Sequence, residues 1–221
     1  MSDKNNDILC LCNLELFGSI GERYFNGFTG TAMFNGFNPI DGLEWVPRQK
    51  AEVDRNYKQV IPYVALYHHP SRTFWTYQRG KAGAEARLHA KRSIGFGGHV
   101  DYTPGVTVAN EGDFEDIVVD AALRELKEEI GLTLVQNQLL HAVGYVNEDE
   151  SDVGCVHLGI CFFISLTNNQ HERLKATESC IVDLKPTSFE DICVDLDKYE
   201  LWSQYFFNTL LLSRTILHQL A

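Results

Sequence analysis

The chain has 221 residues, of which 44% are hydrophobic and 22% charged, as in an ordinary globular protein with a sizeable core. Its formal net charge is -11 and its basic residues form no run, which excludes nucleic-acid or anionic-membrane binding through clustered Lys and Arg. A small phosphorylated ligand is not excluded, because a bound metal and one or two arginines can hold it.

The cysteines and the N-terminus indicate a reducing compartment. None of the 6 cysteines forms a C-x-x-C pair, so a structural zinc site is not expected. The opening segment MSDKNNDILCLC lacks a basic stretch followed by a long apolar run, so no signal peptide is expected. No apolar window approaches transmembrane length. We therefore predict a cytoplasmic protein.

The first half of the chain is typical of strands and turns. Residues 1–56 contain glycine–aromatic segments that we interpret as short strands joined by turns. From residue 57 the pattern changes, since QVIPYVALYHH and FWTYQRG are strand-like runs separated by the turn signal HPSR. These two runs predict a hairpin. The glycine-rich segment SIGFGGHV that follows predicts a loop with room for one short strand.

The second half predicts two helices with strands between them. The segment FEDIVVDAALRELKEEI reads as a helix with Asp113 as N-cap and Gly131 as its stop. Strand-like runs LLHAVGYV, VGCVHLGICFFISL and ESCIVDLKP follow, and the second is apolar enough to be central in a sheet. A helix is expected from about Asp197, with apolar residues at four-residue steps. This order predicts a layered α/β or α+β fold.

An acidic cluster near the end of the first helix requires an explanation. Glu125, Glu128 and Glu129 are neighbours at helical spacing, and like charges so placed cost a few tenths of a kcal/mol per pair. They lie beside the apolar stripe that must face the core, where partial desolvation strengthens the repulsion. Such a cluster becomes favourable when it binds a hard cation such as Mg²⁺. Arg124 could orient one of the carboxylates.

The segment RELKEEIGL, from Arg124 to Leu132, resembles the C-terminal half of the Nudix box, G-x5-E-x7-R-E-U-x-E-E-x-G-U, at every fixed position. The upstream half departs, with Asp116 in place of glutamate and Asn110 in place of glycine. The counterpart of the box glycine by position is Gly98. Seventeen residues then separate it from Asp116 where the pattern has five, an insertion of 12 residues. The chain as a whole is similar to a branch of Nudix-type predicted phosphoesterases.

The resemblance implies an α/β/α sandwich with a mixed sheet, a C-terminal packing helix and a β-rich N-terminal elaboration. Residues 1–56 would be that elaboration and residues 57–221 the Nudix domain. The implied activity is hydrolysis of the diphosphate bond in a small substrate, commonly a nucleoside diphosphate derivative, with Mg²⁺ or Mn²⁺ as cofactor. The implied metal ligands are Glu125, Glu128, Glu129 and the backbone carbonyl of Gly97. The implied catalytic residues are the same three glutamates together with Arg124.

Several roles stay open between alternatives. We favour Glu128 as the general base, with a later acidic turn, residues 148–150, as the alternative source. The candidate substrate contacts are Arg79, Arg87, Gly98 and His99. For the two arginines simple solvation is an equally good interpretation, and for His99 a structural role is the alternative.

Two other function classes compete with hydrolysis. One is a catalytically inactive Nudix-fold module that binds a nucleotide, although such a module commonly loses a ligand glutamate and all three are present. The other is an isomerase of the isopentenyl-diphosphate type, which would need a pocket cysteine such as Cys155 or Cys161. The apolar tail helix covers either its own core or that of a second copy, so a homodimer is one expected state.

Overall fold

The computed structural model describes residues 6–18, 21, 23–31, 42–80, 90–108 and 111–212, with the backbone alone at 111, 112, 211 and 212. The strands are β1 (Asp7–Cys12), β2 (Gly27–Gly30), β3 (Leu43–Pro47), β4 (Tyr57–His68), β5 (Thr73–Arg79), β6 (Arg92–Ser93), β7 (Gly95–Phe96), β8 (His141–Asn147), β9 (His157–Ser165) and β10 (Ile181–Ser188). The α-helices are α1 (Asn13–Phe17), α2 (Arg48–Ala51), α3 (Glu111–Ile130), α4 (Asn168–Arg173), α5 (Phe189–Val194) and α6 (Leu201–Leu212).

The described strands form one mixed sheet in the order β10-β5-β4-β9-β8-β2. Its centre is the parallel pair β4 and β9, in register from Gln59↔His157 to Tyr67↔Ser165, while the other pairs are antiparallel. The predicted hairpin is present, but β4 and β5 pair only at Tyr67↔Phe74 and His68↔Thr73. Beyond that point the short β6 and β7 lie between them, β6 against β5 and β7 against β4.

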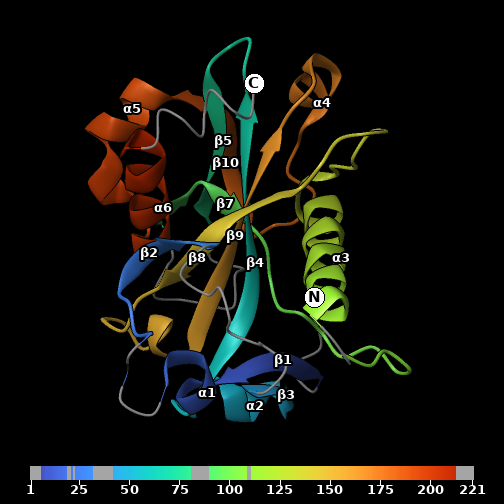
Figure 1. Ribbon diagram of the computed structural model, residues 1–221. Helices are drawn as coiled ribbons and strands as arrows, with labels where there is room; N and C mark the ends of the chain where they lie inside the picture. The colour runs from blue at the N-terminus through green and yellow to red at the C-terminus, as the bar shows by residue number, and fades with distance from the viewer. Residues whose placement is uncertain are drawn as a thin grey trace.

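Helices cover both faces of this sheet, α3 on one and α5 and α6 on the other (Figure 1). The strand period of two sorts the side chains of β9 accordingly. Leu158, Ile160 and Phe162 belong to the core beneath α3, whereas Cys161 and Phe163 belong to the core beneath α6. The predicted α/β/α sandwich with a mixed sheet and a C-terminal packing helix is thus confirmed.

Helix α3 carries the acidic cluster at its C-terminal end. Its stop is the predicted one: Gly131 takes a left-handed φ of 67°, and its amide donates to the Lys127 carbonyl over 3.1 Å. Its start differs, because the helix begins at Glu111 and Asp113 lies inside it rather than capping it. Leu126 and Ile130 are buried at 1% exposure each, which fixes the rotation of the last turns against the sheet.

The N-terminal strands are part of the same sheet. β1 pairs with β4 and with β3, and β2 pairs with β8 (Figure 1). The amide of Leu9 also donates to the Val100 carbonyl over 2.9 Å, and the amide of Tyr102 donates to the backbone carbonyl of Asp7 over 2.9 Å. β1 therefore braces the segment that leads from β7 towards α3. None of the helices described is long and apolar enough to cross a membrane.

Candidate active site

The two glycines after β7 bring the backbone close to the acidic end of α3. Gly97 has a φ of +153°, and a Cβ there would collide with the carbonyl oxygen of Pro62. A Cβ on Gly98 would lie 2.6 Å from the carboxyl carbon of Glu125. Glycine is therefore needed at 97 for the path of the chain, and at 98 it leaves room for the Glu125 carboxylate.

Glu129 is the most deeply placed acid of the cluster. Its side chain is 7% exposed, and one carboxylate oxygen accepts a hydrogen bond from the Gly97 amide over 3.2 Å. Burial, followed by the like charges of Glu125 and Glu178, raises its pKa to about 8, although Arg79 and the Gly97 amide oppose this rise. Glu129 thus lies in surroundings that disfavour its ionised form.

Glu125 and Arg124 connect α3 to the glycine segment. The Arg124 guanidinium donates to the Glu125 carboxylate over 2.7 Å and to the His99 carbonyl over 2.8 Å, and it lies 3.4 Å from the Asp101 carboxylate. Burial and then the charge of Glu128 raise the pKa of Glu125, although Arg124 opposes them. Arg124 therefore contacts Glu125 as well as Glu128.

Glu128 lies at the outer edge of the cluster. Half of its side chain is exposed, at 50%, against 14% for Glu125, and it lies 3.4 Å from Arg124. The three predicted acids are therefore two inward carboxylates, Glu125 and Glu129, and one at the solvent boundary. The use of Glu128 as general base stays a prediction, and an exposed carboxylate can reach a water molecule.

The residues predicted to contact the substrate have different surroundings in the structure. Gly98 lies against Glu125 as described, and Arg79 is held by Glu200, with 2.6 Å between its Nε and the carboxylate. His99 is a half-buried residue whose Nε2 lies 2.9 Å from the Gln59 side-chain oxygen. Burial, then Arg48, His157 and Arg124, hold the pKa of His99 well below 6.5, so the ring is neutral. Arg87 lies outside the described residues.

The acidic turn after β8, the alternative source of a base, is used structurally. Glu148 is 4% exposed and accepts hydrogen bonds from the amides of Glu150 and Ser151 over 2.9 and 3.0 Å. Asp149 forms an ion pair of 2.5 Å with Lys58, whose side chain is buried. Glu148 and Asp149 therefore stabilise their own turn and its anchor on β4. Glu150 is exposed and accepts a hydrogen bond from the Tyr205 hydroxyl over 3.3 Å, and its use as a base stays a prediction.

Glu178 is an acid that sequence reasoning missed. It lies in the segment before β10, and its charge contributes to the raised pKa of both Glu125 and Glu129. The adjacent Thr177 fixes this segment to the end of α3, since its amide donates to the Glu129 carbonyl over 2.9 Å and its hydroxyl donates to the Glu128 carbonyl. No local spacing links Glu178 to the Nudix-box residues.

The cysteines named for an isomerase lie away from the acids. Cys161 is fully buried in the core beneath α6, and the Cys155 thiol donates to the Asp149 carbonyl over 3.3 Å. Cys180 lies nearer, and its thiol donates to Glu178 over 3.2 Å. Burial, then that contact, raises the pKa of Cys180 to about 12, so it remains a thiol.

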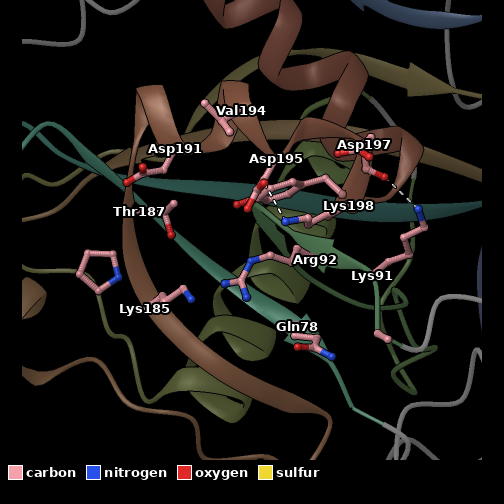
Figure 2. A pocket seen from close by; sticks show the side chains of 13 residues that line it. Gln78, Lys91, Arg92, Lys185, Thr187, Asp191, Val194, Asp195, Asp197 and Lys198 are labelled. Carbon is pink, nitrogen blue, oxygen red and sulfur yellow. Dashed lines mark hydrogen bonds and ion pairs between the residues drawn. The ribbon is translucent and has the colours of Figure 1, made fainter.

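A separate pocket of about 930 Å³ lies on the α5 side of the sheet (Figure 2). Its four cationic side chains already have partners within the protein. Arg92 lies 2.6 Å from Asp183, Lys185 2.9 Å from Asp183, and Lys198 2.7 Å from Asp195, while Lys91 donates to the Asp197 carbonyl over 3.0 Å. The α3 carboxylates do not line it. Because its charges are locally balanced, this pocket offers no net attraction to a phosphate.

The acids at α3 match the chemistry of Mg²⁺ or Mn²⁺. In the part of the chain that the structure describes, no three Asp, Glu, His or Cys side chains converge into a complete metal-binding set. Mg²⁺ does not require one, because it takes one or two carboxylates and completes its octahedron with waters and substrate phosphates. Two carboxylates that repel one another, the half-buried Glu125 and the buried Glu129, supply that donor number.

Comparison with known proteins agrees with this geometry. No family model matches the chain. Protein YmaB of Bacillus subtilis (strain 168) is 31% identical over 166 residues, covering 74% of this chain and 76% of YmaB. The crystal structure of Tm1382, a protein assigned to the Nudix hydrolases, superimposes with a TM-score of 0.68 at 24% identity, covering 93% of this chain and 98% of Tm1382.

A mutT/nudix family protein from Listeria innocua gives a TM-score of 0.49 at 14% identity, covering 74% of this chain and 98% of that one. This more distant likeness adds nothing to the assignment. The chain belongs to the same family as YmaB, and its fold is that of the Nudix superfamily.

Proposed function

We propose that this protein hydrolyses the diphosphate bond of a small substrate, such as a nucleoside diphosphate derivative, with Mg²⁺ or Mn²⁺ bound at the acidic end of α3. The observation that carries the proposal is the pair formed by the half-buried Glu125 and the buried Glu129, whose pKa values are raised by burial and by nearby acids. A buried carboxylate without a paired cation, as at Glu129, destabilises a fold, and a divalent cation between Glu129 and Glu125 would reverse that effect.

The cation, when bound, would neutralise phosphate oxygens and lower the pKa of the attacking water. The protein's own groups have distinct tasks. Glu125 and Glu129 would hold the metal, with Glu128 and the Gly97 carbonyl as further oxygen donors. Arg124 keeps the Glu125 carboxylate in place through its contact of 2.7 Å.

Two residues compete for the role of general base. Glu128 is half exposed and belongs to α3, whereas Glu178 is half-buried and approaches from a different segment. Either carboxylate could accept the proton of the attacking water. Because Glu178 is not part of the helix that carries the metal ligands, it can act without giving up a ligand. We therefore propose Glu178 as the stronger candidate.

The direct test is phosphate release from a panel of nucleoside triphosphates, dinucleoside polyphosphates, ADP-ribose, NADH and nucleotide sugars, with Mg²⁺ or Mn²⁺. Wild type would be compared with Glu129→Gln, Glu128→Gln and Glu178→Gln, and with Glu115→Gln, an exposed acid on α3, as the matched control. We expect metal-dependent turnover that Glu129→Gln abolishes and Glu115→Gln retains. Of the other two variants, the one that lowers kcat while leaving metal affinity unchanged identifies the base.

Other outcomes would contradict hydrolysis. Nucleotide binding without metal-dependent turnover on any member of the panel would indicate a binding module. Conversion of an isoprenoid diphosphate without release of phosphate would indicate an isomerase.

A further inference from the structure

Another buried carboxylate lies on the opposite side of the sheet from α3. Glu200, directly before α6, is 5% exposed and accepts hydrogen bonds from the hydroxyls of Tyr63 over 2.9 Å and Ser93 over 2.6 Å. A buried carboxylate is costly unless donors surround it. The groups that donate hydrogen bonds to Glu200 therefore indicate its role.

The charged partner of Glu200 is Arg79, the last residue of β5. Nε donates to one carboxylate oxygen over 2.6 Å, and Nη2 lies 3.3 Å from the other. Side chains alternate along a strand, so Trp75, Tyr77 and Arg79 leave β5 on the same face. Trp75 and Tyr77 both pack in the core beneath α3. The Arg79 side chain thus leaves β5 on the face that α3 covers, while its guanidinium pairs with Glu200, the residue before α6.

Arg79 is also within electrostatic reach of the candidate active site. Its guanidinium carbon lies 5.7 Å from the centroid of the Tyr77 ring, and that ring lies 4.9 Å from the ring of Phe96. The next residue, Gly97, donates its amide to Glu129, yet the ion pair of Arg79 is with Glu200. An arginine without its own carboxylate partner would form an ion pair with a metal-binding acid and neutralise the charge of that acid. The contact with Glu200 prevents this and leaves one edge of the guanidinium unused.

That unused edge is suited to phosphate. Among the described residues none accepts a hydrogen bond from Nη1 of Arg79, and 30% of the side chain is exposed. A guanidinium has five N–H donors in a planar fork that fits two phosphate oxygens at once. With Nε and one Nη2 hydrogen on Glu200, the end of the guanidinium still has a pair of donors, one on Nη1 and one on Nη2.

We propose that Glu200 is a positioning residue, which holds Arg79 beside the acidic cluster so that its free edge can bind the diphosphate of the substrate. This inference rests on the proposed function. The alternative is that Glu200, Tyr63 and Ser93 only fasten α6 to the sheet, in which case ligand affinity would not depend on Glu200.

The test is calorimetric titration of imidodiphosphate, a non-hydrolysable diphosphate, into the full chain with Mg²⁺. Wild type should bind, and Arg79→Gln should bind about tenfold to a hundredfold more weakly, as expected for loss of charged hydrogen bonds. Glu200→Gln should also weaken binding. Because Glu200 acts through Arg79, the double variant should be no weaker than Arg79→Gln alone.

Two further variants separate positioning from stability. Ser203→Ala removes a hydroxyl that contacts Tyr63 over 2.7 Å but does not contact Arg79, so it should lower the Tm and leave affinity unchanged. Arg79→Lys keeps the charge without the fork and should bind more weakly than wild type. It needs no change at Glu200, so it remains informative if Glu200→Gln fails to fold.

The outcomes that overturn the inference differ from those that overturn the function. If Glu129→Gln abolishes binding while Arg79→Gln, Arg79→Lys and Glu200→Gln bind like wild type, the hydrolase site stands and the positioning role is wrong. Additive losses in the double variant would also contradict it. If wild type binds no imidodiphosphate with Mg²⁺, the proposed function fails and the inference with it.

Discussion

Glu129 and Glu200 are the same residue type, are 7% and 5% exposed, and lie on opposite sides of one sheet, yet their surroundings are opposite in kind. Glu200 is met by an arginine and two hydroxyl groups. Glu129 is met by one backbone amide and by two further acids. The two side chains are buried to a similar extent, so the difference in electrostatic surroundings comes from the groups that contact them.

The comparison distinguishes a carboxylate that supports architecture from one that supports chemistry. A compensated buried acid stabilises its contacts, and removing it leaves donors unsatisfied. An uncompensated one raises the free energy of the folded state until a cation arrives. Electrostatic imbalance, rather than burial or the number of acids, therefore marks the α3 side as the candidate active site.

The largest expected effect comes from the glycine that shapes the acidic site. Gly97→Ala should abolish phosphate release and destabilise the protein by a few kcal/mol, because its Cβ has no room beside the Pro62 carbonyl. Gly105→Ala is the matched control, since Gly105 also has a positive φ, of +86°, but open space around it. The control should cost about 1 kcal/mol and retain activity. Urea unfolding and the phosphate assay measure both, and equal losses at the two positions would refute the crowding argument.

Exchanging each buried glutamate for glutamine tests the comparison itself. In metal-free buffer at pH 8, Glu200→Gln should destabilise by about 3–5 kcal/mol, as for a broken buried ion pair. Glu129→Gln should leave stability unchanged or raise it, because it removes a charge that the fold disfavours. Chemical unfolding in EDTA measures both. A loss for Glu129→Gln as large as that for Glu200→Gln would break the comparison.

The pH dependence of metal-free stability should carry the signature of Glu129. Its pKa is about 8 when folded and has an ordinary value of 4.5, so between these pH values the folded state keeps a proton that the unfolded state has lost. The free energy of unfolding should therefore fall as pH rises from about 4.5 to 8, then level off. The difference between wild type and Glu129→Gln across this range isolates the effect. Saturating Mg²⁺ should reduce it, and a flat difference would contradict the raised pKa.

The smallest effect is expected where only one donor of the compensated acid is removed. Tyr63→Phe deletes a hydroxyl that donates to Glu200, and it should cost about 1–2 kcal/mol. The ion pair with Arg79 remains, so imidodiphosphate affinity should stay unchanged. Thermal unfolding and calorimetry test the two halves of this expectation, and a tenfold loss of affinity would show that the hydroxyl helps to place the arginine.

Local patterns made much of the fold predictable. The apolar run of β9 indicated a central strand, the turn signal after β4 indicated a hairpin, and Gly131 indicated the end of α3. Helices α4 and α5, of six residues each, are too short for a periodicity to reveal. One signal for α4 was nevertheless present, since Thr167 and Gln170 form a capping box.

The candidate site divides in the same way. Arg124, Glu125, Glu128 and Glu129 are neighbours on one helix, so spacing alone brought them together. Glu178 could not be found so, because its segment meets α3 through Thr177, which is 49 residues from Glu128 along the chain. Residues joined only by tertiary packing leave no periodic trace in the sequence.

The bracing of the glycine segment by β1 has a consequence for how the protein folds. β1 must meet residues 57–59 and 100–102, and Arg79 must meet a carboxylate 121 residues further along. Contacts so distant in sequence carry a high loop-closure entropy and slow the folding of small domains. Helix α3 can form early, because its contacts are local. A partly folded chain would thus contain an intact Nudix-box helix and no working site, and activity should recover more slowly than helicity during refolding.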